Sequence, residues 1–433
     1  MKGVIQMGII ILLVLTLAEI FFMVWSLVTK KNHASEKSTA NIAEALIFVV
    51  LSLTGIFIWS FRYYGTAVFL TIFALSGVIT LIRKKEKNFK KCSLISKTIF
   101  KIVFLSFSVF PAIIFPQYRQ MEPTGSAKVL EKTYVFTDES RKEEFADSDI
   151  NRSVTVEVYY PENLSEKCPL VVFSHGAFGF YMSNYSTFSE LASNGYIVAS
   201  INHPYHSFID TEAYGTLVMS DPEILQKTME FQGEDMTDEE FELSHKWLKL
   251  RVDDMSFVID TLKSDSASSS DEILSKIDTD RIGVFGHSLG GAASVQLGRD
   301  RKDIDAVIDV DGTIIGDELD FKDNKIINST EPYPVYFLDI FGENHYNEAQ
   351  QYADMYPNFL ISKNSDKVQN IVMKDAGHLN MTDLPMFSPV IAKYLGTGEV
   401  DSRKCLESLN GVIREFFDWR LKDAEKPEFK EEY

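Results

Sequence analysis

The sequence predicts an α/β protein in two parts, in which an α-helical transmembrane region precedes a domain built on a mostly parallel sheet. Two observations support this prediction. The first 117 of the 433 residues hold four long apolar segments, whereas strands and helices alternate from about residue 129 onward. Such alternation is typical of a parallel sheet covered by helices. We therefore assign residues 1–117 to the transmembrane region and residues 118–433 to the α/β domain.

The four apolar segments each approach the roughly 20 residues that a helix needs to cross a bilayer. They are Val4–Thr29, Ala45–Phe61, Thr66–Ile82 and Ile99–Phe115. The second and third are short, and Lys101, Pro111 and Pro116 interrupt the fourth. The first segment lacks a small-residue cleavage site and further segments follow it, so it does not fit a signal peptide. We expect about four transmembrane helices and an integral protein of the cell membrane.

The two parts carry opposite charge. Residues 1–117 hold 13 Lys and Arg against 4 Asp and Glu, and the remainder holds 30 against 58, which gives net charges of +9 and −28. A domain this acidic would be repelled by nucleic acid and by anionic lipid head groups. The sequence therefore excludes nucleic acid as a partner. It predicts that the helices, not surface charge, hold the protein at the membrane.

The basic residues also predict an orientation, because short loops rich in Lys and Arg stay in the cytoplasm. The loop after the first segment carries Lys30, Lys31 and Lys37. The loop after the third segment carries Arg83, Lys84, Lys85, Lys87, Lys90, Lys91 and Lys97, beside Glu86. Both loops should lie inside, with the N-terminus and an Arg62–Gly65 turn outside. A fourth crossing then places the acidic domain on the extracytoplasmic face.

Isolated acidic and thiol side chains carry less information. Glu19 lies within the first apolar segment, where a carboxylate is a candidate for function. Because the segments hold no second acid or histidine, we expect Glu19 to be a buried group that is hydrogen-bonded or protonated. Cys92, Cys168 and Cys405 are too few and too separated for a metal site or a disulfide framework, and a bridge between the last two stays open.

The α/β domain contains eight expected strands. They are Thr133–Phe136, Val154–Tyr160, Leu170–Phe173, Tyr196–Ser200, Ile282–Phe285, Ala306–Val310, Val335–Ile340 and Asn370–Met373. Tyr185–Ser193 suits a helix that ends at Gly195, and Ser402–Leu421 an amphipathic terminal helix. These elements predict a mostly parallel eight-stranded sheet.

One stretch departs from this alternation. Residues 207–240 are polar and contain no expected strand, and their acidic residues include Glu234, Asp235, Asp238, Glu239 and Glu240. Long irregular insertions in compact domains are usually functional or disordered. This insertion leaves the carboxyl end of the fourth strand, where open α/β sheets bind ligands. We expect an active-site cap, with a solvated decoration as the alternative.

The motif Gly-His-Ser-Leu-Gly at residues 286–290 is the most informative part of the chain. It follows the strand Ile282–Phe285 and opens a helix rich in glycine and alanine. A serine hydroxyl is a weak nucleophile until a tight strand-to-helix turn exposes it beside a base, and small neighbours permit that turn. Ser288 is therefore the expected nucleophile of an α/β-hydrolase fold.

His378 and Asp311 fit the base and the acid of a Ser-His-Asp triad. His378 follows the last expected strand, in the order serine, acid, histidine that this fold requires, whereas His345 comes too early in the chain. Asp311 stands at the carboxyl end of the sixth strand. Asp309 lies deeper on the same face and Asp339 lies inside its own strand, and both remain alternatives for the acid.

The oxyanion donors are expected on either side of the nucleophile. They are the backbone N–H groups of Leu289, which follows Ser288, and of Ala177, in the loop after the third strand. His175 and Gly176 permit a close approach of the backbone there. This chemistry needs no metal and no cofactor, so we expect neither, and no motif identifies a protein partner.

From about Thr133 to Leu421 the chain resembles the plasma and type II branch of the platelet-activating factor acetylhydrolase family. The matching residues are Phe-Ser-His-Gly at 173–176, Gly-His-Ser-Leu-Gly-Gly at 286–291, Asp311 and His378. The resemblance implies Asp311 as the acid and a long segment before a helix like Arg251–Leu262. Two features depart from the family: the Ala-Phe-Gly at 177–179 and the N-terminal region, which lies outside the resemblance.

Motif and resemblance together predict a membrane-anchored serine hydrolase that cleaves acyl esters, with lipid or phospholipid esters among its substrates, through an acyl-enzyme. An acyltransferase that uses the same triad is one alternative. A non-catalytic membrane sensor or scaffold with a vestigial hydrolase domain is another, and the intact nucleophile, base and acid argue against it.

Overall fold

The computed structural model describes residues 6–83, 89–146, 148–230, 237–268, 270–323 and 325–433, and it divides the chain into two compact units. The first unit consists of Met1–Gln120 and Pro385–Tyr394, and the second of Met121–Leu384 and Leu395–Tyr433. The helical unit therefore includes ten residues from late in the chain, which the sequence did not predict.

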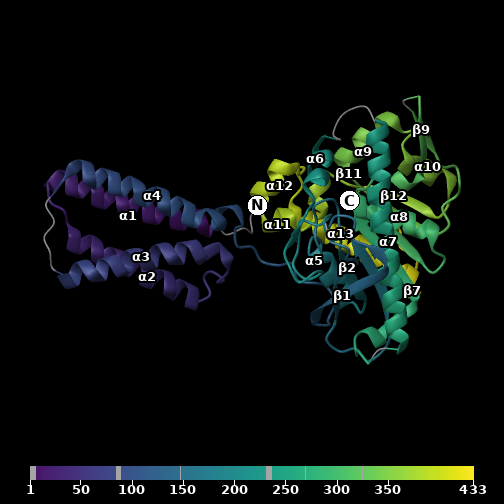
Figure 1. The fold of residues 1–433 in the computed structure, drawn as a ribbon, viewed down its shortest axis with the longest axis horizontal. Coiled ribbons are helices and arrows are strands. Elements are labelled where there is room, and N and C mark those ends of the chain that lie inside the picture. Colours follow the sequence, from purple (N-terminus) through teal and green to yellow (C-terminus); the bar gives the residue numbers. More distant parts are fainter. Residues whose placement is uncertain (1–5, 84–88, 147, 231–236, 269, 324) are drawn as a thin grey trace. The chain divides into compact units, whose positions relative to one another are not determined.

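The helical unit contains four long helices, which are α1 (Met7–Thr29), α2 (Ala34–Leu53), α3 (Phe61–Arg83) and α4 (Lys91–Ile114). Figure 1 shows α1 beside α4 and α2 beside α3. Three of them, α1, α3 and α4, are long and apolar enough to cross a membrane. The interrupted fourth segment is thus among the candidate spans, whereas α2 carries Glu36, Lys37 and Glu44 and is not.

The expected boundaries between the second and third apolar segments are wrong. Helix α2 begins at Ala34 because the polar residues before Glu44 continue the helix, and it ends at Leu53. The connection to α3 is residues 54–60, where Gly55 adopts φ +73°. The expected turn Arg62–Gly65 therefore lies inside α3. Hydropathy alone misplaced the turn because the connection is itself apolar.

Glu19 is buried in the helical unit and hydrogen-bonded, as expected. Lys101 of α4 donates a hydrogen bond to its carboxylate, and Lys37 of α2 lies 2.7 Å away. Lys101 also donates to Asn41 at 2.7 Å. A buried charge is costly unless it is paired in this way. The cluster thus connects α1, α2 and α4.

The late residues of the helical unit lie in two short helices, α11 (Leu384–Phe387) and α12 (Pro389–Leu395). The ring centroid of Phe387 lies 5.0 Å from that of Phe115 and 6.4 Å from that of Phe61. Ser388 donates a hydrogen bond to the carbonyl oxygen of Ile114 at 2.7 Å. Aromatic packing and this hydrogen bond hold the segment to the ends of α3 and α4.

The second unit is built on the expected eight-stranded, mostly parallel sheet, in the order β1-β2-β4-β3-β7-β8-β11-β12. The strands are β1 (Val129–Lys142), β2 (Asn151–Pro161), β3 (Cys168–Ser174), β4 (Ile197–Asn202), β7 (Ile277–His287), β8 (Ala306–Val310), β11 (Tyr336–Gly342) and β12 (Val368–Met373). Strands β1 and β2 pair antiparallel, as do β2 and β4, and the other pairs are parallel. All eight expected strands are present.

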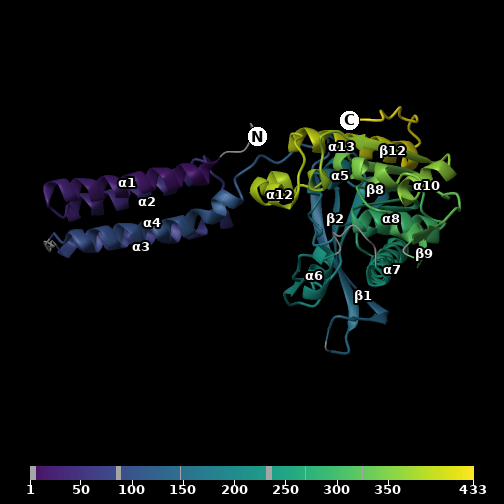
Figure 2. The ribbon, with the colours of Figure 1, turned by 90° about the horizontal axis from the view of Figure 1, so that it is seen from above.

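Helices cover both faces of this sheet. Figure 2 shows α5 (Tyr185–Ser193) and α13 (Ser402–Leu421) on one face, and α7 (Asp238–Ser268) and α8 (Leu289–Asp300) on the other. Because both faces are covered, β8 is buried along its whole length, and β7 is buried from Ile282 to His287. Gly283 permits close packing: a Cβ there would lie 2.6 Å from the ring of Phe417 in α13.

The insertion at 207–240 is more ordered than the sequence predicted. It contains two paired strands of two residues, β5 (Ile209–Asp210) and β6 (Val218–Met219), followed by α6 (Pro222–Glu230). The expectation of no strand is therefore wrong, because two residues are too few to leave an alternating pattern. Glu234 and Asp235 lie outside the described residues, and Asp238, Glu239 and Glu240 form the first turn of α7.

Smaller elements complete the second unit. They are a hairpin of β9 (Glu318–Lys322) and β10 (Lys325–Asn328), and helices α9 (Glu343–Ala349) and α10 (Pro357–Asn364). All three cysteines are free, so the bridge between Cys168 and Cys405 is not formed.

Candidate active site

Ser288 occupies a strained turn between β7 and α8. Its backbone has φ +56° and ψ −125°, which a residue with a side chain rarely adopts outside functional sites. Its N–H donates to the carbonyl oxygen of Val310 at 2.9 Å. A Cβ at Gly286 would lie 2.1 Å from Gly290, and one at Gly290 would lie 2.0 Å from the carbonyl oxygen of Ser174. The small neighbours of Ser288 are thus required by the turn.

Asp311 and His378 come together at the carboxyl ends of β8 and β12. The Nδ1 of His378 lies 2.7 Å from the Oδ2 of Asp311, the distance of a strong hydrogen bond to a carboxylate. The carboxylate is fully buried, whereas the His378 side chain is 44% exposed and so can reach a substrate. The Gly342 N–H donates to the Oδ1 of Asp311 at 2.6 Å. It is thus Asp311, and not Asp309 or Asp339, that the structure pairs with His378.

The three aspartates also differ in protonation. Burial alone would raise the pKa of Asp311, but hydrogen bonds from His345 and His378 outweigh it and hold the pKa far below its usual range. Burial raises the pKa of Asp339 to about 8 and that of Asp309 well above its usual value. Of the three, only Asp311 has a pKa shifted toward the ionised form, and an anion is what orients a catalytic histidine. This favours Asp311 as the acid.

A second histidine, His345, shares Asp311. Its Nδ1 donates to the Oδ1 of Asp311 at 3.0 Å, and its Nε2 lies 2.5 Å from the hydroxyl of Tyr356, which in turn lies 2.7 Å from that of Thr313. The sequence indicated only that His345 comes too early to be the base, and this supporting role was not predicted. The sequence feature that could have indicated this role is the position of His345 directly after β11, which neighbours β8 in the sheet.

His287, inside the nucleophile motif, holds the other side of the site. Its Nε2 donates to the carbonyl oxygen of His378 at 3.0 Å, and the two ring centroids are 4.4 Å apart. Burial lowers the pKa of His287 to about 3, so its ring is neutral. It fixes the backbone of His378, which sequence reasoning did not predict.

The expected oxyanion loop lies directly against the nucleophile. A Cβ at Gly176 would lie 3.1 Å from the Cβ of Ser288. The next residues turn sharply, with φ +58° at Phe178. The Ala177 N–H donates to no described residue, and the Leu289 N–H, at the first position of α8, has no acceptor within its helix. Among the described residues both N–H groups thus lack an acceptor, and both stay candidates for the expected oxyanion donors.

A buried polar network anchors this loop from behind. The hydroxyl of Ser174 lies 2.9 Å from the Nε2 of His203, whose Nδ1 lies 2.9 Å from Asp254 of α7. Arg152 contacts both oxygens of Asp254, at 2.7 and 2.6 Å. Because Ser174, His203 and Asp254 are fully buried, this second Ser-His-Asp arrangement has no access to a substrate. It is structural.

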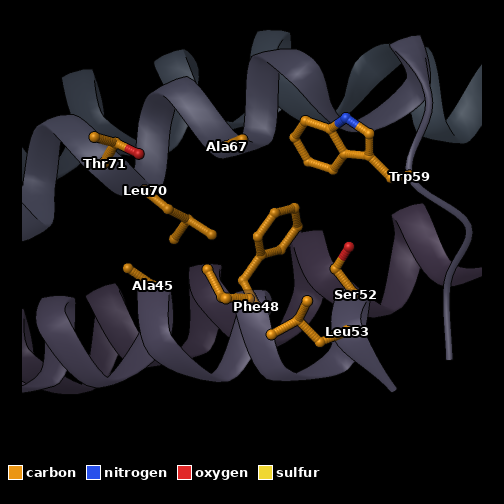
Figure 3. Close-up of a pocket in the computed structure, with 9 residues that line it drawn as sticks. Ala45, Phe48, Ser52, Leu53, Trp59, Ala67, Leu70 and Thr71 are labelled. Carbon is orange, nitrogen blue, oxygen red and sulfur yellow. The ribbon is translucent and has the colours of Figure 1, made fainter. Parts of the chain in front are cut away.

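A pocket in the helical unit is unrelated to this chemistry. It lies between α2 and α3, as Figure 3 shows, and its lining includes Phe48, Trp59 and Leu70. The lining holds no acidic, basic or histidine side chain. It can therefore accommodate hydrocarbon but offers no catalytic group.

The eight-stranded sheet, the strained elbow at Ser288 and the His378–Asp311 pair define a protein of the α/β-hydrolase fold. A family profile described as platelet-activating factor acetylhydrolase, isoform II, matches residues 139–426. The chain belongs to this family, which confirms the resemblance inferred from the motifs. The match does not include the four long helices.

Curated relatives agree with this assignment. The chain is 26% identical over 280 residues to platelet-activating factor acetylhydrolase of Canis lupus familiaris, covering 60% of this chain and 59% of that protein. It is 27% identical over 281 residues to the protein of the same name from Bos taurus, covering 59% and 58%. The chain thus spans less than two thirds of the length of these relatives.

A solved structure shows the same fold. Ferulic acid esterase from Streptomyces cinnamoneus superposes with a TM-score of 0.53 and 19% sequence identity, covering 71% of this chain and 94% of that one. At this identity the similarity concerns the fold.

Proposed function

We propose that the protein is a membrane-anchored serine hydrolase that cleaves acyl esters, with phospholipid esters as its main substrate class. The observation that carries the proposal is the strained Ser288 elbow combined with the short Asp311–His378 hydrogen bond. Family membership supports it, because the relatives are named acetylhydrolases. We extend to this chain a preference for acetyl or other short acyl groups.

In the proposed mechanism, Ser288 Oγ attacks the ester carbonyl while His378 Nε2 takes its proton. Asp311 keeps the Nδ1 proton on His378 and stabilises the imidazolium that forms. The N–H groups of Ala177 and Leu289 bind the oxyanion of the tetrahedral intermediate. Collapse releases the alcohol, which takes the proton from His378, and leaves the acyl group on Ser288. Water then repeats these steps and releases the acid.

The membrane anchor brings the domain to its substrate. Helices α1, α3 and α4 are the candidate spans, and the net charge of the rest of the chain opposes binding to an anionic lipid surface. The proposed topology also requires α2, which is not among these candidates but packs against α3, to cross the membrane with them. The last residues of α1 and α3 and the first residues of α2 and α4, which include Arg83, Lys37 and Lys91, lie at one end of the antiparallel helices. By the positive-inside rule this end faces the cytoplasm and the α/β domain is extracytoplasmic.

The test is an ester panel on the full-length protein in lipid nanodiscs. It comprises p-nitrophenyl acetate, butyrate and octanoate, and phosphatidylcholines with an acetyl or a long acyl group at the second position. We expect hydrolysis of the short esters and loss of it in Ser288→Ala. A folded wild-type protein that hydrolyses none of them would overturn the proposal. Transfer of the acyl group to an added alcohol in preference to water would instead identify an acyltransferase.

A further inference from the structure

Arg251 of α7 is a fully buried cation directly behind the oxyanion loop. Its Nη1 donates to the carbonyl oxygen of His175 at 2.7 Å, and its Nη2 lies 3.5 Å from that of Gly176. Its longer contacts are with the Ser174 hydroxyl and with His206. None of its hydrogen bonds with described residues involves a carboxylate.

The neighbouring buried arginine is different. Arg152 forms ion pairs with Asp254 at 2.6 Å and with Glu143 at 2.8 Å, so its charge is neutralised by direct partners. A buried charge that lacks such a partner is costly and is seldom retained for stability alone. Perturbed charges of this kind cluster at functional sites. Arg251 is thus a candidate for a role in the reaction.

Peptide geometry connects Arg251 to the oxyanion donors. All peptide bonds that the structure describes are trans, so the N–H of each residue points opposite to the carbonyl of the residue before it. The carbonyls of His175 and Gly176 point at the guanidinium. The N–H groups of Gly176 and Ala177 therefore point away from it. The short hydrogen bond to the His175 carbonyl sets the direction of the Gly176 N–H. The longer contact with the Gly176 carbonyl adds to the hydrogen bonds that this oxygen accepts from His175 Nδ1 at 2.7 Å and from the Gly179 N–H at 3.0 Å, which together orient the Ala177 N–H.

The groups that contact Arg251 directly carry no negative charge to pair with its own. Burial lowers the pKa of His203 to about 3 and the pKa values of His175 and His206 well below their usual value, so all three rings are neutral. Asp254 favours the charged form of Arg251 through space, but its carboxylate is bound directly by Arg141, Arg152 and His203. Burial also lowers the pKa of Arg251, to about 9, which leaves it charged at neutral pH.

We propose that Arg251 is an electrostatic positioning residue of the oxyanion hole. It orients the loop at residues 175–177 and places a positive charge behind the donors, where it stabilises the negative charge that develops on the substrate oxygen. The inference rests on the proposed function, because it requires Ser288 to attack a carbonyl. Preorganised charge of this kind acts in the transition state and not in the ground state.

The test compares three substitutions that separate charge from shape in the full-length protein. Arg251→Met removes the charge, Arg251→Gln removes it but keeps a donor for His175, and Arg251→Lys keeps it. We measure kcat and KM on p-nitrophenyl acetate and the inhibition constant of an aryl trifluoromethyl ketone, whose adduct with serine carries an oxyanion. Arg299→Met, which removes a partly buried arginine paired with Asp317 at the far end of α8, is the control for stability loss.

We expect Arg251→Met and Arg251→Gln to lower kcat by roughly 10- to 100-fold and to leave KM nearly unchanged. This loss is smaller than the roughly 10²–10³-fold loss of kcat on removal of a direct oxyanion donor. The inhibition constant of the ketone should rise by a similar factor. Arg251→Lys should retain part of the kcat and part of the ketone affinity that the other two variants lose, and Arg299→Met should change neither quantity. If Arg251→Met does not fold, the comparison of Arg251→Gln with Arg251→Lys still separates the effect of charge from that of structure.

Two outcomes overturn the inference alone. In one, fluorophosphonate labels wild type but not Ser288→Ala, yet the folded Gln variant matches wild type in kcat and ketone affinity. In the other, Arg251→Lys lowers kcat as much as Arg251→Gln does, and KM rises at the same time, which indicates that Arg251 has only a structural role. If wild type is neither labelled nor active on any ester, the proposed function and this inference fall together.

Discussion

At the scale of single residues, the site depends on the hydrogen bonds that three neighbouring buried aspartates accept. Asp311 receives hydrogen bonds from Gly342, His345 and His378, whereas one carboxylate oxygen of Asp309 and one of Asp339 are buried without a described partner. Burial disfavours a charge, and only hydrogen bonds to the ionised form reverse this effect. The environment thus favours the ionised form at one position and the protonated form at the two others.

This difference predicts unequal mutants. Asp311→Asn should keep the fold but lose about 10⁴-fold in kcat, because His378 would be held in the wrong tautomer. Asp339→Asn is the matched control: it replaces a group that is already neutral, so kcat should change little. Steady-state kinetics on p-nitrophenyl acetate measures both. Near-normal activity in Asp311→Asn would contradict the assignment of the acid.

Glu318 predicts a pH dependence of stability. It is 4% exposed, and burial raises its pKa to about 7. Between the unfolded value near 4.5 and about 7, the folded state holds a proton that the unfolded state has lost, so the free energy of unfolding falls as the pH rises. Glu318→Gln should therefore stabilise the protein at pH 8 by on the order of 2–3 kcal/mol and not at pH 4. Equal thermal midpoints of mutant and wild type at pH 8 would contradict this.

Ser288, Asp311 and His378 were predictable from the sequence because each follows a recognisable strand in the chain order of the fold. The supporting residues were not. Arg251 is 76 residues from His175, and His345 is 34 residues from Asp311, so their contacts depend on the packing of separate elements. Histidines and arginines of this kind have no local pattern that distinguishes them from surface residues.

At the scale of elements, long periodic segments were predictable and short or polar ones were not. The helix Ser402–Leu421 and the strand Ala306–Val310 have the bounds expected from their patterns. The pair β5–β6 was missed because a strand of two residues is too short for a period-2 signal. The hairpin β9–β10 was missed because its mostly unburied strands lack the continuous apolar run of Ala306–Val310. The polar start of α2 was not predicted, because a hydropathy pattern identifies apolar segments and cannot show that a polar segment is helical.

The insertion predicts a change in substrate selectivity. The Asp221 N–H donates a hydrogen bond to the carbonyl oxygen of Tyr205, and the Tyr214 hydroxyl donates one to Glu143. These residues are kept, so the part to be replaced is residues 222–236, which begin with α6. If this part caps the acyl pocket, exchange for a short Gly-Ser linker should change the ratio of octanoate to acetate hydrolysis more than the rate on acetate. An unchanged ratio in a folded variant would make the segment a solvated decoration.

At the scale of the whole molecule, the opposite charges of the two parts predict the topology. With both basic connections in the cytoplasm, α4 must carry the chain outward, and protease added to intact cells should remove the α/β domain. Immunoblotting with tags at both termini reads the result. Full protection of the α/β domain until lysis would mean that α4 or α2 does not cross, and the domain would then be cytoplasmic.

The central claim, that Ser288 is an activated nucleophile, is tested most directly by a fluorophosphonate probe on the full-length protein in nanodiscs. The probe reacts with serines that a base activates, and its phosphorus adduct mimics the tetrahedral state of acyl transfer. Mass spectrometry of the labelled peptide should place the probe on Ser288, and Ser288→Ala should remove both the label and, by on the order of 10⁶-fold, the esterase turnover. Absence of labelling in folded wild-type protein, or labelling that persists in Ser288→Ala, would contradict the claim.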